Sequence, residues 1–283
     1  MRQLRVSEFP GLLHEIPDKP KRLYVRGTLP PEDTIYLCVV GSRRTTAYGQ
    51  RMTHQLIAGL ARSPVAIVSG MAMGIDSEAH KAALDVGLPT VAVLPSGLDD
   101  RVLYPSVNRP LAKRILALGS ALLSENEPDF IAMLHSFPER NRISAGISKA
   151  TLIIEAGEKS GTLITARLAL DYNREVMGIP HELGKETGMG VNRLLREGAT
   201  LVRNSDDVLQ VLGLKPSDKP EQATLPTDIT DAEAAILEVL TEPFMRDELI
   251  ALADLTAQEA NIALSSLLIR GLILERLGKI ERA

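Results

Sequence analysis

The sequence has 283 residues, of which 45% are hydrophobic, 3% are aromatic and none is tryptophan, and its net charge is −4. This length and apolar content fit one large globular domain with a small second one, or two domains, and no apolar run approaches the roughly 20 residues of a membrane span. The N-terminus lacks the apolar segment of a secretion signal, and a single cysteine, Cys38, excludes a disulfide within the chain. We therefore expect a cytoplasmic protein without membrane contact.

Residues 1–34 contain five prolines and a local excess of lysine and arginine. Proline has no N–H to donate to a helix or a sheet, so this composition predicts an irregular N-terminal extension that packs on the main domain. Residues 23–25 are a short apolar run, and we expect them to add an edge strand.

From residue 35 onward, short apolar runs alternate with amphipathic helical patterns. The predicted strands cover residues 35–40, 65–69, 90–94, 121–123, 151–154 and 175–179. The first predicted helix follows a turn at residues 41–44 and ends near residue 61. The other predicted helices cover residues 77–86, 110–118, 138–149, 163–170 and 191–197. This alternation predicts an α/β fold with an extended Rossmann-like, doubly wound, mostly parallel sheet over residues 35–212.

Ligands of doubly wound sheets bind at the carboxyl ends of the strands. Five of the predicted strands are followed directly by glycine or serine turns, at Gly41, Gly70, Gly97, Ser124 and Gly157. These turns all face one edge of the sheet, where we expect the binding site.

Residues 213–229 hold three prolines and few apolar residues, and they are predicted to be a linker. Residues 230–283 follow with three predicted helices and a final strand, the outline of a small winged-helix-like domain. This domain is acidic: residues 228–283 have a net charge of −6, which leaves +2 for the first 227 residues. A polyanion site is therefore expected in the Rossmann-like domain, and the winged-helix-like domain is not expected to be the main DNA contact.

The stretch from residue 151 to residue 171 combines a buried strand, a glycine-bearing turn and a helix. This geometry directs free backbone N–H groups and the positive end of a helix at an anion. Ser160, Gly161 and Thr162 lie in the turn, and we predict that they bind phosphate. The alternative is an ordinary turn whose serine or threonine only caps the helix.

Three groups of polar residues complete the predicted site. Arginine presents fixed donors that match phosphate oxygens, and arginines placed at strand ends or helix starts therefore indicate an anionic partner. The alternative for the third group is ion pairing with Glu125, Glu127 or Glu139. The groups are Gly41, Ser42, Arg43 and Arg44; Asn108 and Arg109; and Arg140, Asn141 and Arg142.

The sequence contains no pattern that indicates catalysis, a metal or a cofactor. Its histidines and cysteine lack metal-ligand spacing, and the dinucleotide fingerprint is absent after the first strand. Asp76, Glu125 and Glu155 lie near strand ends, but no nucleophile or second acid is placed beside them, so we expect them to cap or to form ion pairs.

Six motifs in fixed order give this chain a clear resemblance to a known family. They are Gly41-Ser42-Arg43; Ser-Gly-Met-Ala-Met-Gly-Ile-Asp at 69–76; Gly97 with Tyr-Pro-Ser-Val-Asn at 104–108; Phe-Pro-Glu-Arg-Asn-Arg-Ile at 137–143; Glu155-Ala156 with Ser-Gly-Thr-Leu-Ile-Thr-Ala at 160–166; and Asn-Arg-Leu-Leu-Arg-Glu-Gly-Ala at 192–199. In these motifs the chain resembles the DNA processing protein A family, DprA or Smf.

The resemblance implies an extended Rossmann-like fold, a homodimer and no enzymatic activity. It also implies binding of single-stranded DNA, protection of incoming DNA and loading of the RecA recombinase during natural transformation. Carried over by motif, Gly41, Ser42, Arg43, Arg109, Arg140 and Arg142 would contact DNA, and the turn at Ser160 would lie beside them. For the dimer, the sequence offers Met177 and Ile179 as apolar surface candidates.

The chain departs from the family pattern in two places, and two other functions remain open. Many members have a helical domain before the Rossmann-like part, where this chain has about 30 residues, and Pro180-His181 stands where the family tends to have Pro-Gly. A related family of nucleoside-monophosphate phosphoribohydrolases has a similar phosphate turn, although Thr165 stands where its glutamate would be. The third possibility is a transcription regulator that acts through the winged-helix-like domain.

Overall fold

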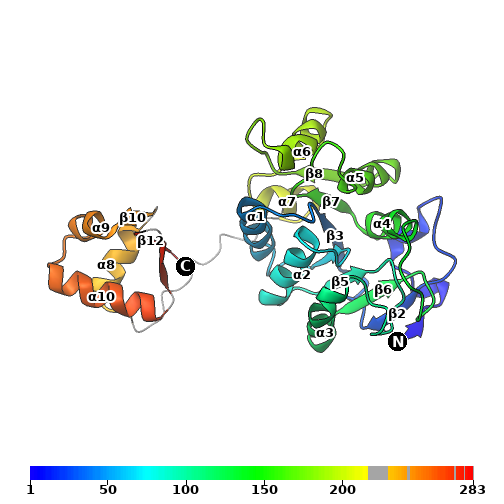
Figure 1. Ribbon diagram of the computed structural model, residues 1–283, viewed down its shortest axis with the longest axis horizontal. Coiled ribbons are helices and arrows are strands. Elements are labelled where there is room, and N and C mark those ends of the chain that lie inside the picture. Colours follow the sequence, from blue (N-terminus) through cyan, green and yellow to red (C-terminus); the bar gives the residue numbers. More distant parts are fainter. Residues whose placement is uncertain (216–228, 241–242, 271, 277, 283) are drawn as a thin grey trace. The chain divides into compact units, whose positions relative to one another are not determined.

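The structure is a computed structural model that describes residues 1–215, 229–240, 243–270, 272–276 and 278–282. The chain divides into two compact units, Met1–Asp218 and Lys219–Ala283 (Figure 1). Of the predicted linker, residues 216–228 lie outside the described residues.

The larger unit is built on a nine-stranded sheet with the order β1-β2-β6-β5-β4-β3-β7-β8-β9. All neighbours from β6 to β9 pair in parallel, whereas β1 and β2 are antiparallel additions beside β6. The strands are β1 Arg2–Gln3, β2 Tyr24–Gly27, β3 Ile35–Val40, β4 Val65–Ser69, β5 Thr90–Val93, β6 Ala121–Ser124, β7 Ala150–Ile153, β8 Glu175–Gly178 and β9 Thr200–Leu201.

Helices cover both faces of this sheet (Figure 1). They are α1 Ala47–Ala58, α2 Ile75–Asp85, α3 Arg109–Ala117, α4 Ser136–Ile147, α5 Thr162–Asp171, α6 Glu186–Arg196 and α7 Ser205–Val211, with short 3-10 turns at Val6–Glu8, Gly11–His14 and Ser106–Asn108. Successive strand residues point to opposite faces, so Cys38 and Val40 of β3 join a core with α4, α5 and α6. Leu37 and Val39 join a second core with α1, α2 and α7. The predicted doubly wound, mostly parallel sheet is confirmed.

The first 34 residues contribute to this sheet and to its core. The strand predicted at residues 23–25 forms as β2, but it is not the edge strand, because β1 pairs outside it. Leu13 and Leu23 are fully buried. The buried Arg174 also donates to Glu15 and to the carbonyl of Leu12, at 2.7 and 2.8 Å, and so ties the extension to the helical layer beside β8.

Two predictions about the late part of this unit were wrong. The helix predicted to begin at residue 191 begins at Glu186 as α6. Its early turns contain Gly190, where an added Cβ would lie 2.6 Å from the carbonyl oxygen of Gly157, so this glycine reflects close packing rather than a loop. Met177 and Ile179, offered as dimer surface, are fully buried inside the unit and cannot meet a partner.

The smaller unit contains helices α8 Asp231–Val239, α9 Arg246–Leu252 and α10 Ala257–Ile269, and a three-stranded sheet of β10 Phe244–Met245, β11 Ile273–Arg276 and β12 Lys279–Arg282. Thr256 caps α10 and forms a capping box with Glu259. The assignment of this unit as winged-helix-like stays a prediction. Among the described residues, no helix is both long and apolar enough to cross a membrane.

The buried extension gives a test of the fold. We expect Leu23→Ala to lower the free energy of unfolding of the larger unit by about 2–5 kcal/mol, because it removes a fully buried side chain and leaves a cavity. The matched control is Leu118→Ala, at a leucine that is 57% exposed, for which a change within about 0.5 kcal/mol is expected. Urea unfolding followed by circular dichroism measures both. Equal effects would mean that the extension is not part of the core.

Candidate nucleic-acid interface

The direction of the strand order reverses between β3 and β7. From β3 the chain proceeds through β4, β5 and β6 on one side, and then returns through α4 to β7 on the other side of β3. The loops that leave β3 and β7 therefore diverge at the carboxyl edge of the sheet. Such a switch point is where open α/β sheets bind their ligands.

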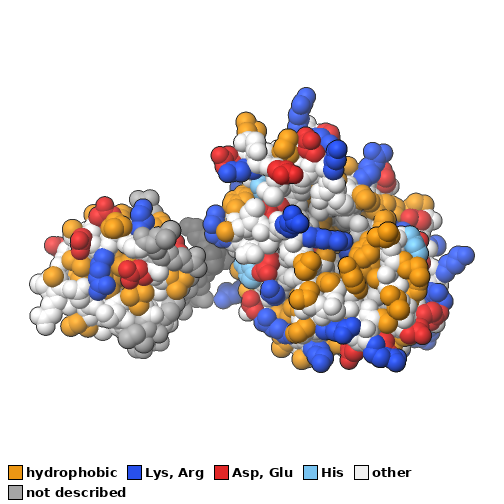
Figure 2. Space-filling view, in the orientation of Figure 1, with side chains coloured by type: hydrophobic (Ala, Val, Ile, Leu, Met, Phe, Trp, Pro, Cys, Tyr) orange, Lys and Arg blue, Asp and Glu red, His pale blue; other side chains and the backbone are white. Residues whose placement is uncertain are grey.

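An open pocket of about 540 Å³ lies at this switch point. In the space-filling view, Lys and Arg side chains border a hollow near the middle of the face shown (Figure 2). Nine of the twelve residues predicted to contact DNA line the pocket: Gly41, Ser42, Arg43, Arg44, Arg140, Asn141, Ser160, Gly161 and Thr162. The structure thus brings together three segments that lie far apart in the sequence.

Residues 41–46, here called the arginine loop, connect β3 to α1 and carry Arg43 and Arg44. Ser42 shapes the loop, because its hydroxyl accepts from the N–H of Arg44 at 3.1 Å and donates to the carbonyl of Arg44 at 2.9 Å. Both arginines are exposed, and within the described chain neither forms an ion pair. The Arg43 guanidinium lies 5.4 Å from the ring centre of Phe137, a distance typical of a cation–π contact. Both charges are therefore available to an anion.

Arg140 forms the floor of the pocket. It is 8% exposed, and its Nη1 donates to the carbonyl of Val93 at 3.1 Å. The guanidinium lies against Gly70, where an added Cβ would come within 1.5 Å of Nη1. The Nε of Arg140 is buried and has no hydrogen-bond partner among the described residues. A buried cation with an unused donor at the base of a pocket is suited to an anionic ligand.

One carboxylate, that of Asp76, also lines the pocket. Asp76 is 6% exposed, and its Oδ2 accepts from the N–H of Ala72 at 3.3 Å. Burial raises the pKa of Asp76, and the positive charge of Arg140 opposes that rise. Burial also disfavours the charged form of Arg140 and lowers its pKa. The negative charge of Asp76 opposes this decrease, whereas the positive charge of Arg43 adds to it. Asp76 therefore offsets part of the positive charge that the pocket concentrates.

The turn before α5 faces the arginine loop across the pocket. The Ser160 hydroxyl accepts from the N–H of Thr162 at 3.2 Å and donates to the Thr162 hydroxyl at 3.0 Å. Ser160 thus shapes the turn that precedes α5, whose N-cap residue, Gly161, makes no side-chain cap. Ser160, Gly161 and Thr162 all line the pocket.

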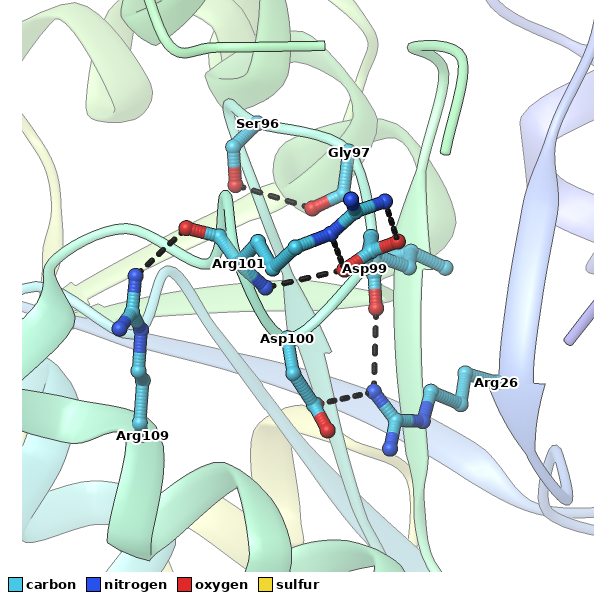
Figure 3. A network of polar contacts seen from close by, with 8 residues as sticks. Arg26, Ser96, Gly97, Asp99, Asp100, Arg101 and Arg109 are labelled. Atoms are coloured by element: carbon cyan, nitrogen blue, oxygen red, sulfur yellow. Dashed lines mark hydrogen bonds and ion pairs between the residues drawn. The ribbon is translucent and has the colours of Figure 1, made fainter. Parts of the chain in front are cut away.

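The other three predicted contacts lie outside the pocket. The Asn108 amide donates to the Met71 carbonyl at 2.7 Å and to the Ser77 hydroxyl at 2.8 Å. Arg109 donates to the carbonyl of Arg101 at 2.6 Å, within a surface network (Figure 3).

Arg142 turns to the opposite flank of α4. It pairs with Glu125 at 2.5 Å and, more loosely, with Asp18 at 3.8 Å. Ion pairing with Glu125 is one of the alternatives that the sequence left open for this group.

Comparisons with known proteins agree with this geometry. Residues 3–213 match the family described as DNA recombination-mediator protein A. Protein Smf of Escherichia coli is 37% identical over 278 residues, which cover 97% of this chain and 73% of the relative. This chain belongs to the DNA recombination-mediator protein A family.

Solved structures of DNA processing protein A resemble this family member in fold. The protein from Streptococcus pneumoniae has a TM-score of 0.69 and 36% identity, covering 74% of this chain and 73% of its own. The protein from Helicobacter pylori, whose structure concerns its single-stranded DNA binding mode, has a TM-score of 0.65 and 31% identity, covering 75% of this chain and 96% of its own.

In this family member, His181 organises the loop after β8, where the sequence departs from Pro-Gly. Its Nε2 lies 2.7 Å from the carbonyl oxygen of Ile154 and therefore donates to it. Its ring packs edge-on against Tyr48, with 5.2 Å between ring centres, and the Tyr48 hydroxyl donates to the carbonyl of Pro180 at 2.9 Å. The departure thus ties the end of β7, the loop after β8 and the start of α1 together.

Phe137 and Asp76 also line the pocket, although the sequence did not assign them to it. Phe137 belongs to a motif that was already recognised, and Asp76 ends another. The signal was therefore present, but their roles depend on which side of each helix faces the pocket.

A buried histidine behind the pocket makes stability depend on pH. His80 is fully buried one helical turn after Asp76, and its Nδ1 lies 2.7 Å from the Thr90 hydroxyl. That hydroxyl donates its proton to the carbonyl of Ile67, so Nδ1 of a neutral His80 donates to Thr90. Burial, with a smaller effect from the charge of Arg140, lowers the pKa of His80 to about 3.

We expect His80 to destabilise the fold as the pH falls below its unfolded pKa of about 6.5. The folded pKa is lower than the unfolded pKa. The stabilising contribution of neutral His80 is therefore complete above about pH 6.5 and is lost progressively as the pH falls towards 3. Between pH 7 and pH 5 the loss should be about 2 kcal/mol. His80→Gln should flatten this pH dependence in urea unfolding, whereas His135→Gln, at an exposed histidine, should leave it unchanged. Identical slopes for the parent and His80→Gln would contradict the assignment.

Proposed function

We propose that this protein is a recombination mediator that binds single-stranded DNA in the pocket at the switch point. The observation that carries the proposal is the convergence of Arg43, Arg44 and Arg140 with the Ser160–Thr162 turn on one open pocket. Arginines suit phosphate oxygens, and the positive end of α5 at this turn favours the same anion. Family membership and the Helicobacter pylori relative, which binds single-stranded DNA, support the choice of ligand.

The proposed contacts are the nine pocket residues. For Asn108, Arg109 and Arg142, their hydrogen bonds and ion pairs within the chain support a role in holding the loops around the pocket. We propose that the protein protects incoming DNA and loads the RecA recombinase during natural transformation, as a homodimer in the cytoplasm. What supports these finer points is the family resemblance.

The proposal treats the protein as a binding protein and not as an enzyme. The competing function, hydrolysis of nucleoside monophosphates, would need a carboxylate where Thr165 lines the pocket. The carboxylate in the lining, Asp76, accepts a hydrogen bond from the Ala72 backbone, which supports a structural role. Incubation with nucleoside monophosphates, followed by chromatography, tests this; release of free base would favour the enzyme.

We expect single-stranded DNA to bind more tightly than duplex of the same length, with little preference for sequence. The pocket offers cations and N–H donors, which recognise the backbone rather than the base edges. Affinity should fall linearly with salt on a logarithmic scale, because bound phosphates release counterions. Fluorescence anisotropy with labelled single-stranded and duplex DNA over a salt series measures this. Preference for duplex, or affinity that is independent of salt, would refute the proposal.

We expect Arg43→Ala to weaken binding of single-stranded DNA about 5- to 150-fold, which corresponds to the loss of a charge-assisted contact worth roughly 1–3 kcal/mol. The slope of affinity against salt should also fall in magnitude by about one phosphate. Arg43→Lys keeps the charge but loses the planar fork of donors. Its affinity should therefore lie between those of the parent chain and of Arg43→Ala.

Arg167→Ala is the matched control for Arg43→Ala, because Arg167 is exposed and pairs with Asp171 on the surface of α5. It should change neither the affinity nor the salt slope. Folding of all variants should be unchanged. Unaltered affinity of Arg43→Ala would place the DNA site elsewhere.

A further inference from the structure

The arginine loop has its own anchor outside the pocket. Glu155 follows β7 and is fully buried, and it does not line the pocket. Its carboxylate accepts from the N–H of Thr46, with Oε2 at 3.1 Å, and from the Thr46 hydroxyl. Thr46 is the last residue of the arginine loop and the N-cap of α1, where its hydroxyl also accepts from the N–H of Gly49.

The start of α1 leaves space for the Glu155 carboxylate because it has a glycine there. A Cβ at position 49 would lie 2.4 Å from the carboxyl carbon of Glu155, so the third residue of α1 has to be glycine for the carboxylate to fit. Glycine inside a helix costs about 1 kcal/mol relative to alanine, and the chain accepts that cost here. Glu155 also contacts the N-terminal end of α1.

The contact bridges the switch point itself. Glu155 follows β7 and Thr46 follows β3, and these neighbouring strands pair through Val40 and Ile153. The arginine loop is therefore held at both ends, by the sheet at Val40, which precedes it, and by Glu155 at Thr46. Arg43 and Arg44 lie between the two anchors.

We propose that Glu155 is a positioning residue, which acts through Thr46 to hold Arg43 and Arg44 in the geometry that binds a phosphate backbone. This inference rests on the proposed function of the pocket. In this role the carboxylate favours DNA binding, whereas its charge alone would oppose binding, because a negative charge near the pocket repels phosphate.

The two effects predict opposite results for a variant that removes the charge. If Glu155 acted only by its charge, Glu155→Gln would strengthen DNA binding. If it positions the loop, Glu155→Gln should weaken binding of a labelled oligothymidylate about 3- to 10-fold, the equivalent of roughly one hydrogen bond. Thr46→Val, which removes the hydroxyl, should weaken binding similarly, and Thr46→Ser should restore it. Thr53→Val is the matched control, because Thr53 is a buried threonine of α1 whose hydroxyl bonds within the helix to Gly49, and its affinity should not change.

A double-mutant cycle separates positioning from general loss of stability. In the Arg43→Ala background, Glu155→Gln should have a much smaller effect on affinity than in the parent chain, because the side chain that it positions is absent. Melting of each full-length variant, followed by circular dichroism, shows that the folded protein is being compared.

Three results would overturn the proposal. Glu155→Gln could leave binding unchanged or strengthen it, or it could weaken binding equally in both backgrounds. If Arg43→Ala itself does not weaken DNA binding, the proposed function of the pocket is wrong as well. If only the positioning role is wrong, Arg43→Ala still weakens binding, so the two failures are distinguished.

Discussion

The parallel pairing of β3 with β7 is the constraint on which the site depends. β3 lies in the middle of the sheet with β4 on one side and β7 on the other, so the loops leaving β3 and β7 start side by side and then separate. The gap between them is a consequence of topology, because α1 and α5 turn back onto opposite faces of the sheet. Residues that are more than a hundred positions apart in the sequence can therefore share a pocket without any long loop.

The second constraint is electrostatic. Placing Arg140 under the pocket removes its guanidinium from water. This is unfavourable unless its N–H donors find acceptors and its positive charge is balanced by a negative one. Val93 and Asp76 provide part of this compensation, while the charge of Arg43 opposes it. A phosphate group would supply what is missing: acceptors for the unused donor and negative charge between two like cations. The site is thus held in a geometry that an anion would stabilise, which is the behaviour expected of a preorganised binding site.

Much of this arrangement could be predicted from the sequence. Short apolar runs located the strands, and glycine or serine after five of these six runs located the edge where ligands bind. The sequence could not show which arginines of a cluster face the pocket. Arg140 and Arg142 are two residues apart on one helix and therefore point in different directions. Arg142 meets Glu125 and Asp18, whose positions depend on how β6 and the N-terminal extension fold back. Similarly, α6 begins earlier than predicted. Glycine disfavours a helix by its intrinsic propensity, but Gly190 permits close contact with the turn at Gly157.

The two edges of the large sheet are each closed by a strand of only two residues, β1 at Arg2–Gln3 and β9 at Thr200–Leu201. Edge strands with long rows of unpaired backbone groups can add strands from other molecules and thereby aggregate. A high local concentration of the protein favours such addition. Short edge strands leave few unpaired N–H and C=O groups for such addition, so these molecules can come close together without joining their sheets.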